Sequence, residues 1–99
     1  MMGMKMKKAT KLDASEYLES DADIVAYLNA ALEDGNTSVI ATALGNIARA
    51  KGMTQLAKET GITRDGLYKA LSPTGNPSFD TVQKVVKAFG LKLDVAAAV

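Results

Sequence analysis

Polar and basic side chains gather between Gln55 and Lys69 in this 99-residue chain. If residues 63–69 form a helix, the side chains outside its apolar side are Thr63, Arg64, Asp65, Gly66, Tyr68 and Lys69. Arg64 could donate two hydrogen bonds to one guanine, and Lys69 could reach a phosphate or a guanine. Tyr68 offers a ring edge and a hydroxyl, and Gln55 could donate to a phosphate beside the first turn of its own helix. These residue types therefore predict contact with the major groove of DNA.

Residue size indicates how such a helix would be positioned. Ala57 comes four residues before Gly61, and Ile62 follows at once. Two helices that cross at about 90 to 120° after a short turn need a small residue at their contact and a turn residue that tolerates a positive φ. Ala57 and Gly61 meet these needs. The inward side would then consist of Leu56, Ile62, Leu67 and Ala70 or Leu71, with Thr63 capping the second helix.

Each of these side chains also has a purely structural interpretation. Exposed Arg, Lys and Tyr residues are often only solvated or cover apolar neighbours, and Gln55 needs no function at the start of a helix. The spacing of Ala57 and Gly61 favours DNA contact over that alternative. Phosphates would repel Asp65, so we expect it to pair with Lys69 four residues later, the alternative being a hydrogen bond from a cytosine amino group.

The rest of the chain predicts helices almost throughout. Apolar residues recur at spacings of three and four from Tyr17 to Leu32, from Val39 to Ala48 and from Phe79 to Phe89. The first stretch fits a short helix and then a longer one that ends near Asp34. Ser72–Pro77 is a predicted loop, because it holds both prolines and a glycine. The expected N-caps are Asp13 or Ser15, Asp21, Thr37 or Ser38, and Ser78. The predicted fold is all-α, with five to six helices.

Residues 91–95 are the only strand candidate, because they alternate apolar and polar side chains. A lone strand either frays or pairs with a second copy of itself. In an antiparallel pair Lys92 of one chain would lie near Asp94 of the other. We therefore expect a homodimer whose interface includes Phe89, Leu91, Leu93 and Val95. The alternative is a frayed tail and dimerisation through helix faces.

Composition excludes most enzyme classes. The chain has no cysteine and no histidine, which removes disulfides, thiol nucleophiles, imidazole bases and Cys/His zinc sites. We therefore expect no enzymatic activity, no cofactor and no metal. The neighbouring acids Asp21 and Asp23 could suggest a magnesium site, but helix capping explains them more simply.

Length and apolar content predict one domain. Ninety-nine residues, 47% of them apolar and 23% charged, suit a single core. We expect a flexible basic N-terminus over residues 1–11, the domain over 12–95 and a flexible tail over 96–99. The longest nearly apolar stretch, Val39–Leu44, is too short to cross a membrane, and the first residues lack the apolar run of an export signal. A cytoplasmic protein with no membrane partner is expected.

The net charge of +1 conceals an uneven distribution. Residues 1–12 carry four lysines, residues 13–34 carry seven acids and no base, and residues 35–99 carry eight bases and four acids. Fields of opposite sign steer different ligands, so this division predicts two surfaces with different partners. The alternative is a solvated acidic helix face.

A resemblance to known proteins rests on nearly the whole chain from Leu12 onward. Met53–Leu93, MTQLAKETGITRDGLYKALSPTGNPSFDTVQKVVKAFGLKL, resembles the Xre/Cro/C1-type helix-turn-helix of phage repressors and antitoxins. More narrowly, YLNAALEDGNTSVIATALGNIARAKGMTQLAKETG together with LYKALSPTGNPSF resembles the HigA-like addiction-module antidote family, antitoxins encoded beside small RelE-fold toxins. Thr60, at a usually apolar position, and Gly66, within the second helix, depart from the general helix-turn-helix pattern.

The resemblance implies a lambda-repressor-like domain that binds operator double-stranded DNA as a homodimer. It also implies that the protein represses its own operon and neutralises a small basic ribonuclease-type toxin. Acidic surroundings fit such a toxin at Tyr17, Leu18, Tyr27 and Leu28, although a stripe at this spacing is more often core. Two alternatives stay open: a free-standing prophage-type regulator, and a helical protein-binding module without DNA contact, which the low net charge allows.

Overall fold

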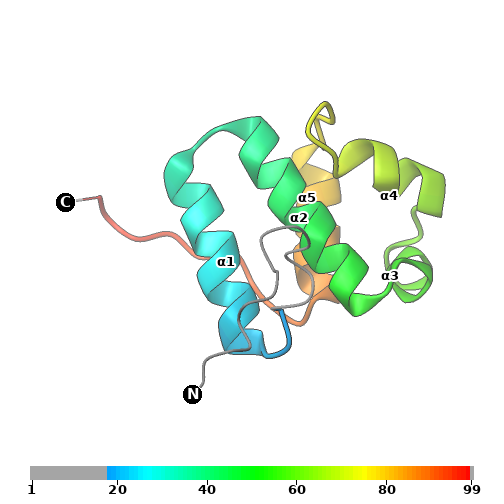
Figure 1. Cartoon of the computed structure of the whole chain (residues 1–99), viewed down its shortest axis with the longest axis horizontal. Helices are drawn as coiled ribbons and strands as arrows, with labels where there is room; N and C mark the ends of the chain where they lie inside the picture. The colour runs from blue at the N-terminus through cyan, green and yellow to red at the C-terminus, as the bar shows by residue number, and fades with distance from the viewer. Residues whose placement is uncertain (1–17, 99) are drawn as a thin grey trace, which may run out of the picture.

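Five α-helices make up the regular structure of the computed structural model, which describes residues 18–98 (Figure 1). They are α1 (Asp21–Asp34), α2 (Thr37–Lys51), α3 (Met53–Thr60), α4 (Arg64–Ala70) and α5 (Phe79–Ala88). The prediction of an all-α fold is confirmed. The short helix expected around Tyr17 falls mostly outside the described residues, and residues 18–20 are not helical.

The strand predicted at residues 91–95 is not formed. Residues 18–98 contain no strand, and residues 91–98 form no regular element. The physical reason is that a strand is defined by hydrogen bonds to a neighbouring strand, and the described part of one chain supplies no such neighbour.

Side-chain caps determine where α1 and α2 begin. The Ser20 hydroxyl accepts a hydrogen bond from the Asp23 N–H at 3.1 Å, and the Asp23 carboxylate accepts one from the Ser20 N–H at 3.3 Å. Asn36 caps α2, its Oδ1 accepting from the Ser38 N–H at 2.8 Å. The caps predicted for these two helices lay one or two residues further on, because Ser20 and Asn36 offer a capping oxygen earlier in the chain.

α2 is the central helix of the core. It packs against α1, α3 and α4, and α3 packs in turn against α4 and α5. The buried residues of α2 are Ala41, Ala43, Leu44, Gly45, Ile47 and Ala48. The rest of the core consists of Leu18, Ile24, Leu28, Ala31, Met53, Leu56, Leu67, Leu71, Val85, Val86 and Phe89. No helix in the described part of the chain is long and apolar enough to cross a membrane.

Phe79 is the clearest exception to the predicted core. Helical periodicity places it on the apolar side of α5, but its side chain is exposed. Phe79 is the first residue of α5, and the buried positions of that helix lie in its second half, at Val85 and Val86. The first turn of α5 therefore extends beyond the part that the core covers.

The end of α4 lies directly against α2 at Gly45. A Cβ atom on Gly45 would overlap the carbonyl oxygen of Leu71. The following loop is tied to the start of α2, because the Ser38 hydroxyl donates to the Pro73 carbonyl oxygen at 2.8 Å. α2 therefore determines where α4 ends. Figure 1 places α1 and α4 on opposite sides of α2.

We expect Gly45→Ala to lower the free energy of unfolding by about 1 to 2 kcal/mol, because the added methyl group must push the end of α4 away from α2. The loss should appear even though alanine is intrinsically the better helix former by about 1 kcal/mol. Urea unfolding followed by circular dichroism measures the change. Asn29→Ala, at an exposed position of α1, is the control and should leave stability unchanged or slightly raised. An unchanged G45A protein would contradict this account of the packing.

Candidate nucleic-acid interface

The residues predicted to form two helices around a tight turn do so. α3 ends at Thr60 and α4 begins at Arg64. Gly61, in the turn, adopts a left-handed conformation with φ of 76°, and its N–H donates to the Ala57 carbonyl oxygen at 2.9 Å. Few residues other than glycine adopt this conformation without strain. Gly61 therefore allows the chain to turn directly from α3 into α4.

The inner side of α4 holds it against the core. Leu67 has no exposed surface, and Leu56 and Leu71 are almost as fully buried. Ile62 and Ala70 are partly buried and pack against the same core. This inward set is the one that the sequence predicted. Burial of Leu67 also determines the rotation of α4, because the side chains on the opposite face must then point to solvent.

The outer side of α4 presents Thr63, Arg64, Asp65, Tyr68 and Lys69, all of them exposed. Thr63 caps the helix as predicted, its Oγ1 accepting from the Gly66 N–H at 3.0 Å. The Arg64 Cζ lies 5.8 Å from the centroid of the Tyr68 ring, within range of a cation–π contact. Such a contact restrains the guanidinium but leaves its in-plane N–H groups available to a ligand.

Asp65 does not make the predicted ion pair with Lys69. Within residues 18–98 the ion pairs involve other residues, on α1, α2 and α5. Both side chains are exposed, where an ion pair gains little over hydration. Lys69 is therefore not neutralised by its neighbour on the helix.

Gln55 is engaged along its own helix. Its Nε2 donates to the Glu59 Oε2 at 2.9 Å, one turn later on α3. Both residues are exposed. This bond uses one of the two N–H groups of the Gln55 amide and leaves the other for a ligand.

Thr60 and Gly66, which depart from the general pattern, both serve the turn. The Thr60 hydroxyl donates to the Leu56 carbonyl oxygen at 2.8 Å and accepts from the Ile62 N–H at 3.2 Å. A Cβ on Gly66 would lie 3.1 Å from the Thr63 Oγ1 and 3.2 Å from the Ile62 Cγ2, closer than side chains usually pack. Thr60 thus stabilises the end of α3, and the missing side chain of Gly66 leaves room for the Thr63 cap of α4.

The loop after α4 is folded back more tightly than the sequence indicated. The Ser72 hydroxyl donates to the Lys69 carbonyl oxygen at 3.0 Å, and the Gly75 N–H donates to the Ser72 carbonyl oxygen at 2.9 Å. A Cβ on Gly75 would overlap the carbonyl oxygens of the last two residues of α4. Thr74 and Asn76 are consequently exposed beside the end of α4. The signal in the sequence was the glycine placed between two prolines.

The residues considered for toxin contact lie in different environments. Leu18 and Leu28 belong to the core and present little surface. Tyr27 is half-buried, and its hydroxyl accepts from the Asn46 Nδ2 at 2.7 Å. Tyr17 lies outside the described residues.

The residues considered for dimerisation are divided between core and surface. Phe89 belongs to the core, and Leu91 is half-buried, its N–H donating to the Val86 carbonyl oxygen at 3.2 Å. Leu93 and Val95 are exposed. From residue 92 to residue 98 no backbone group bonds to another backbone group within the described chain. The Val95 N–H donates to the Asp94 Oδ1 at 2.9 Å. The other backbone groups of this segment and its apolar side chains are available to a partner.

The comparisons with known proteins cover nearly the whole chain. Residues 8–97, which include all five helices, match the sequence profile of a family described as probable addiction module antidote protein. The chain is also similar to a Haemophilus influenzae (strain ATCC 51907 / DSM 11121 / KW20 / Rd) protein described as uncharacterized. The two are 53% identical over 83 residues, which is 84% of this chain and 86% of that protein. No solved structure matches the chain.

Proposed function

Because the chain belongs to the family of probable addiction module antidote proteins, we propose that it is the antitoxin of a type II toxin–antitoxin module and the repressor of its own operon. In this proposal α3 and α4 form a HigA-like, lambda-repressor-like helix-turn-helix that binds operator DNA. The antitoxin neutralises a small basic RelE-fold ribonuclease in the cytoplasm. An antidote family suggests a regulatory protein rather than an enzyme.

The observation that carries the DNA-binding proposal is the two-sided character of α4. Its inner side is anchored by the fully buried Leu67, so its outer side projects from a rigid frame. On that outer side Arg64 and Lys69 have no ion-pair partner within the described residues. The planar guanidinium of Arg64 suits the two acceptors of a guanine, whereas Lys69 suits a phosphate. Thr74 and Asn76 are placed to add contacts to the DNA backbone.

A two-fold dimer is proposed through the C-terminal segment. Pairing residues 91–95 of two chains in antiparallel order would satisfy their free backbone groups and place Lys92 of each chain near Asp94 of the other. Leu93 and Val95 would be covered, with Phe89 beneath them in the core. An isologous contact of this kind would present two copies of α4 about one turn of DNA, roughly 34 Å, apart.

Titration of the operator tests DNA binding directly. We expect a duplex from the promoter of the chain's own operon to bind the dimer, with affinity falling as salt rises because lysine and arginine release counterions from phosphates. Fluorescence anisotropy measures it, and a scrambled duplex of equal length is the control. If no duplex binds at low salt, the repressor proposal fails and a protein-binding module is favoured. If the operator binds but the operon encodes no toxin, a free-standing regulator is favoured.

Substitutions on α4 separate sequence reading from general affinity. Arg64→Ala should cost about 1 to 3 kcal/mol and relax discrimination at one base pair, whereas Lys69→Ala should weaken all duplexes similarly. Anisotropy titrations against single-base variants of the operator measure both effects. Lys87→Ala, at an exposed position of α5, is the matched control and should change affinity less than about twofold. If both α4 variants lose the same affinity for every duplex, Arg64 contacts a phosphate and not a base.

Shortening the chain tests the dimer. A protein that ends after Leu91 keeps the half-buried Leu91 but loses the segment available for pairing. We expect it to sediment as a monomer at micromolar concentration and to bind the operator more weakly, because each α4 then binds independently. A thermal melt checks that it remains folded. A shortened protein that stays dimeric would place the interface on helix faces instead.

A further inference from the structure

Three exposed apolar side chains meet in one groove. Val25 and Leu32 on α1 are 41% and 43% exposed, and Leu93 after α5 is 39% exposed. They line a groove of about 420 Å³ whose other apolar walls are Leu28, Val86 and Leu91. Val25 and Leu32 are two helical turns apart on one side of α1, so the groove runs along that helix.

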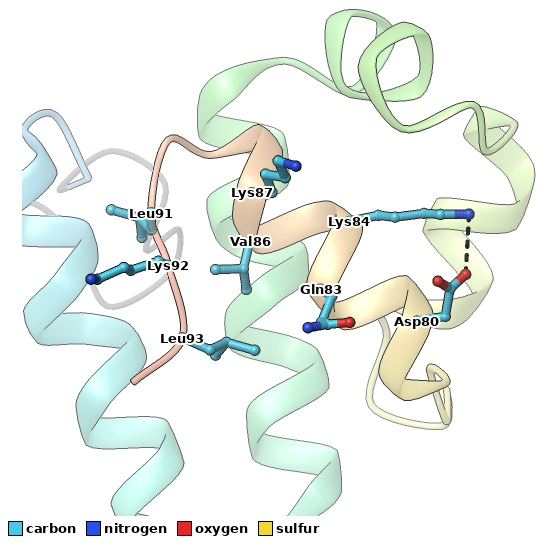
Figure 2. Close-up of a pocket in the computed structure, with 8 residues that line it drawn as sticks. All are labelled: Asp80, Gln83, Lys84, Val86, Lys87, Leu91, Lys92 and Leu93. Atoms are coloured by element: carbon cyan, nitrogen blue, oxygen red, sulfur yellow. Dashed lines mark ion pairs between the residues drawn. The ribbon is translucent and has the colours of Figure 1, made fainter. Parts of the chain in front are cut away.

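The C-terminal segment forms the far wall of this groove. Figure 2 shows residues 91–93 passing between α5 and α1. The hydrogen bond from the Leu91 N–H to Val86 fixes the start of the segment against α5. Lys92 and Asp94 also line the groove, together with Asn29 on the α1 side. The groove thus has a mostly apolar floor and polar groups at its edges.

The charges on α1 decide which partners the groove suits. α1 carries Asp21, Asp23, Glu33 and Asp34 and contains no basic residue. Asp23 is used in the capping box, and the Asp21 carboxylate lies 3.9 Å from the Lys51 ammonium. Glu33 and Asp34 lie in the last turn, where the helix dipole disfavours negative charge and no base of α1 offsets it. Asp34 lines the groove on the other flank of α1, whereas Glu33 follows Leu32 and lies one turn after Asn29, both of which line this groove. This end of α1 favours a cationic partner.

A second copy of this chain fits the groove poorly. A two-fold contact centred on this groove would bring α1 of one copy against α1 of the other, and both helices carry acids and no base. A basic protein meets no such repulsion. The dimer proposed above pairs the backbone of residues 91–95 instead and does not require α1. The groove is lined by α1, and Figure 1 places α1 and α4 on opposite sides of α2, so a protein bound there leaves the outer face of α4 free.

We infer that this groove is the docking surface for the toxin, an inference that rests on the proposed function. Apolar side chains on one toxin helix fill the space beside Val25 and Leu32, and a lysine or arginine flanking them pairs with Glu33. Toxin contact is thereby assigned to the side of α1 that carries Val25 and Leu32, with Leu28 in the groove wall, whereas Tyr27 lines the groove on the other flank.

The test uses the protein encoded by the neighbouring gene of the operon, titrated by calorimetry into the full-length chain. The double variant Val25→Gln/Leu32→Gln should raise Kd at least about tenfold, because it removes two apolar contacts at the centre of the interface. The matched control is Val39→Gln, which is 42% exposed on α2 and lines the groove on the other flank of α1. It should change Kd by less than about twofold. Glu33→Gln should weaken binding modestly and reduce its salt dependence.

Further measurements keep the outcomes distinct. Thermal melts and operator titrations of the variants should match the wild type, because the substituted side chains are exposed and none of them belongs to α3 or α4. Unchanged toxin affinity in the double variant, or a larger loss in V39Q, would overturn the inference. Dissociation of the dimer by the double variant would assign the groove to a second copy. If the wild type binds the operator but not the neighbouring protein, the antitoxin proposal fails together with the groove's occupant, while DNA binding stands.

Discussion

The contact between α4 and the core is the interaction on which the proposed DNA-binding surface depends. α4 has only seven residues, too few to be stable as an isolated helix. It persists because Leu67 is completely buried and because the absence of a side chain at Gly45 lets the end of α4 lie against α2. The same contacts fix which side of α4 is outward. The direction in which the proposed recognition residues point is therefore set by packing on the opposite side of the helix.

The central position of α2 also separates the two charged surfaces. α1, with its four acids, lies on one side of α2, and the basic residues of α4 lie on the other. The near-neutral net charge of the whole chain thus conceals an acidic helix on one side and a more basic helix on the other. The Lys51–Asp21 ion pair joins the two helices at their exposed ends, where such a pair contributes little to stability. The apolar core, rather than charge pairing, keeps the surfaces apart.

The segment after α5 takes part in both proposed binding sites. It forms one wall of the groove beside α1, and its backbone groups from residue 92 onward are not used by other backbone groups of the described chain. Within residues 91–98, Leu91 alone is fixed to α5 by a backbone hydrogen bond. The proposed dimer and the proposed toxin site therefore share this segment. Dimerisation and toxin binding would act on the same residues.

The sequence by itself determined the helices, the turn and the inward side of α4. Periodic apolar residues, the glycine at position 61 and the capping threonine at position 63 act over a few residues, so local reasoning is sufficient to find them. Tertiary structure alone decided that Phe79 is exposed, that Leu18 and Leu28 are core and that Val25, Leu32 and Leu93 meet in a groove. It also explained Gly45, whose missing side chain matters only because the end of α4 lies against it. Periodicity identifies an apolar face, but which part of that face is covered depends on where distant segments end. For the same reason the alternating pattern at residues 91–95 could not establish a strand, since a strand is a property of two segments and not of one.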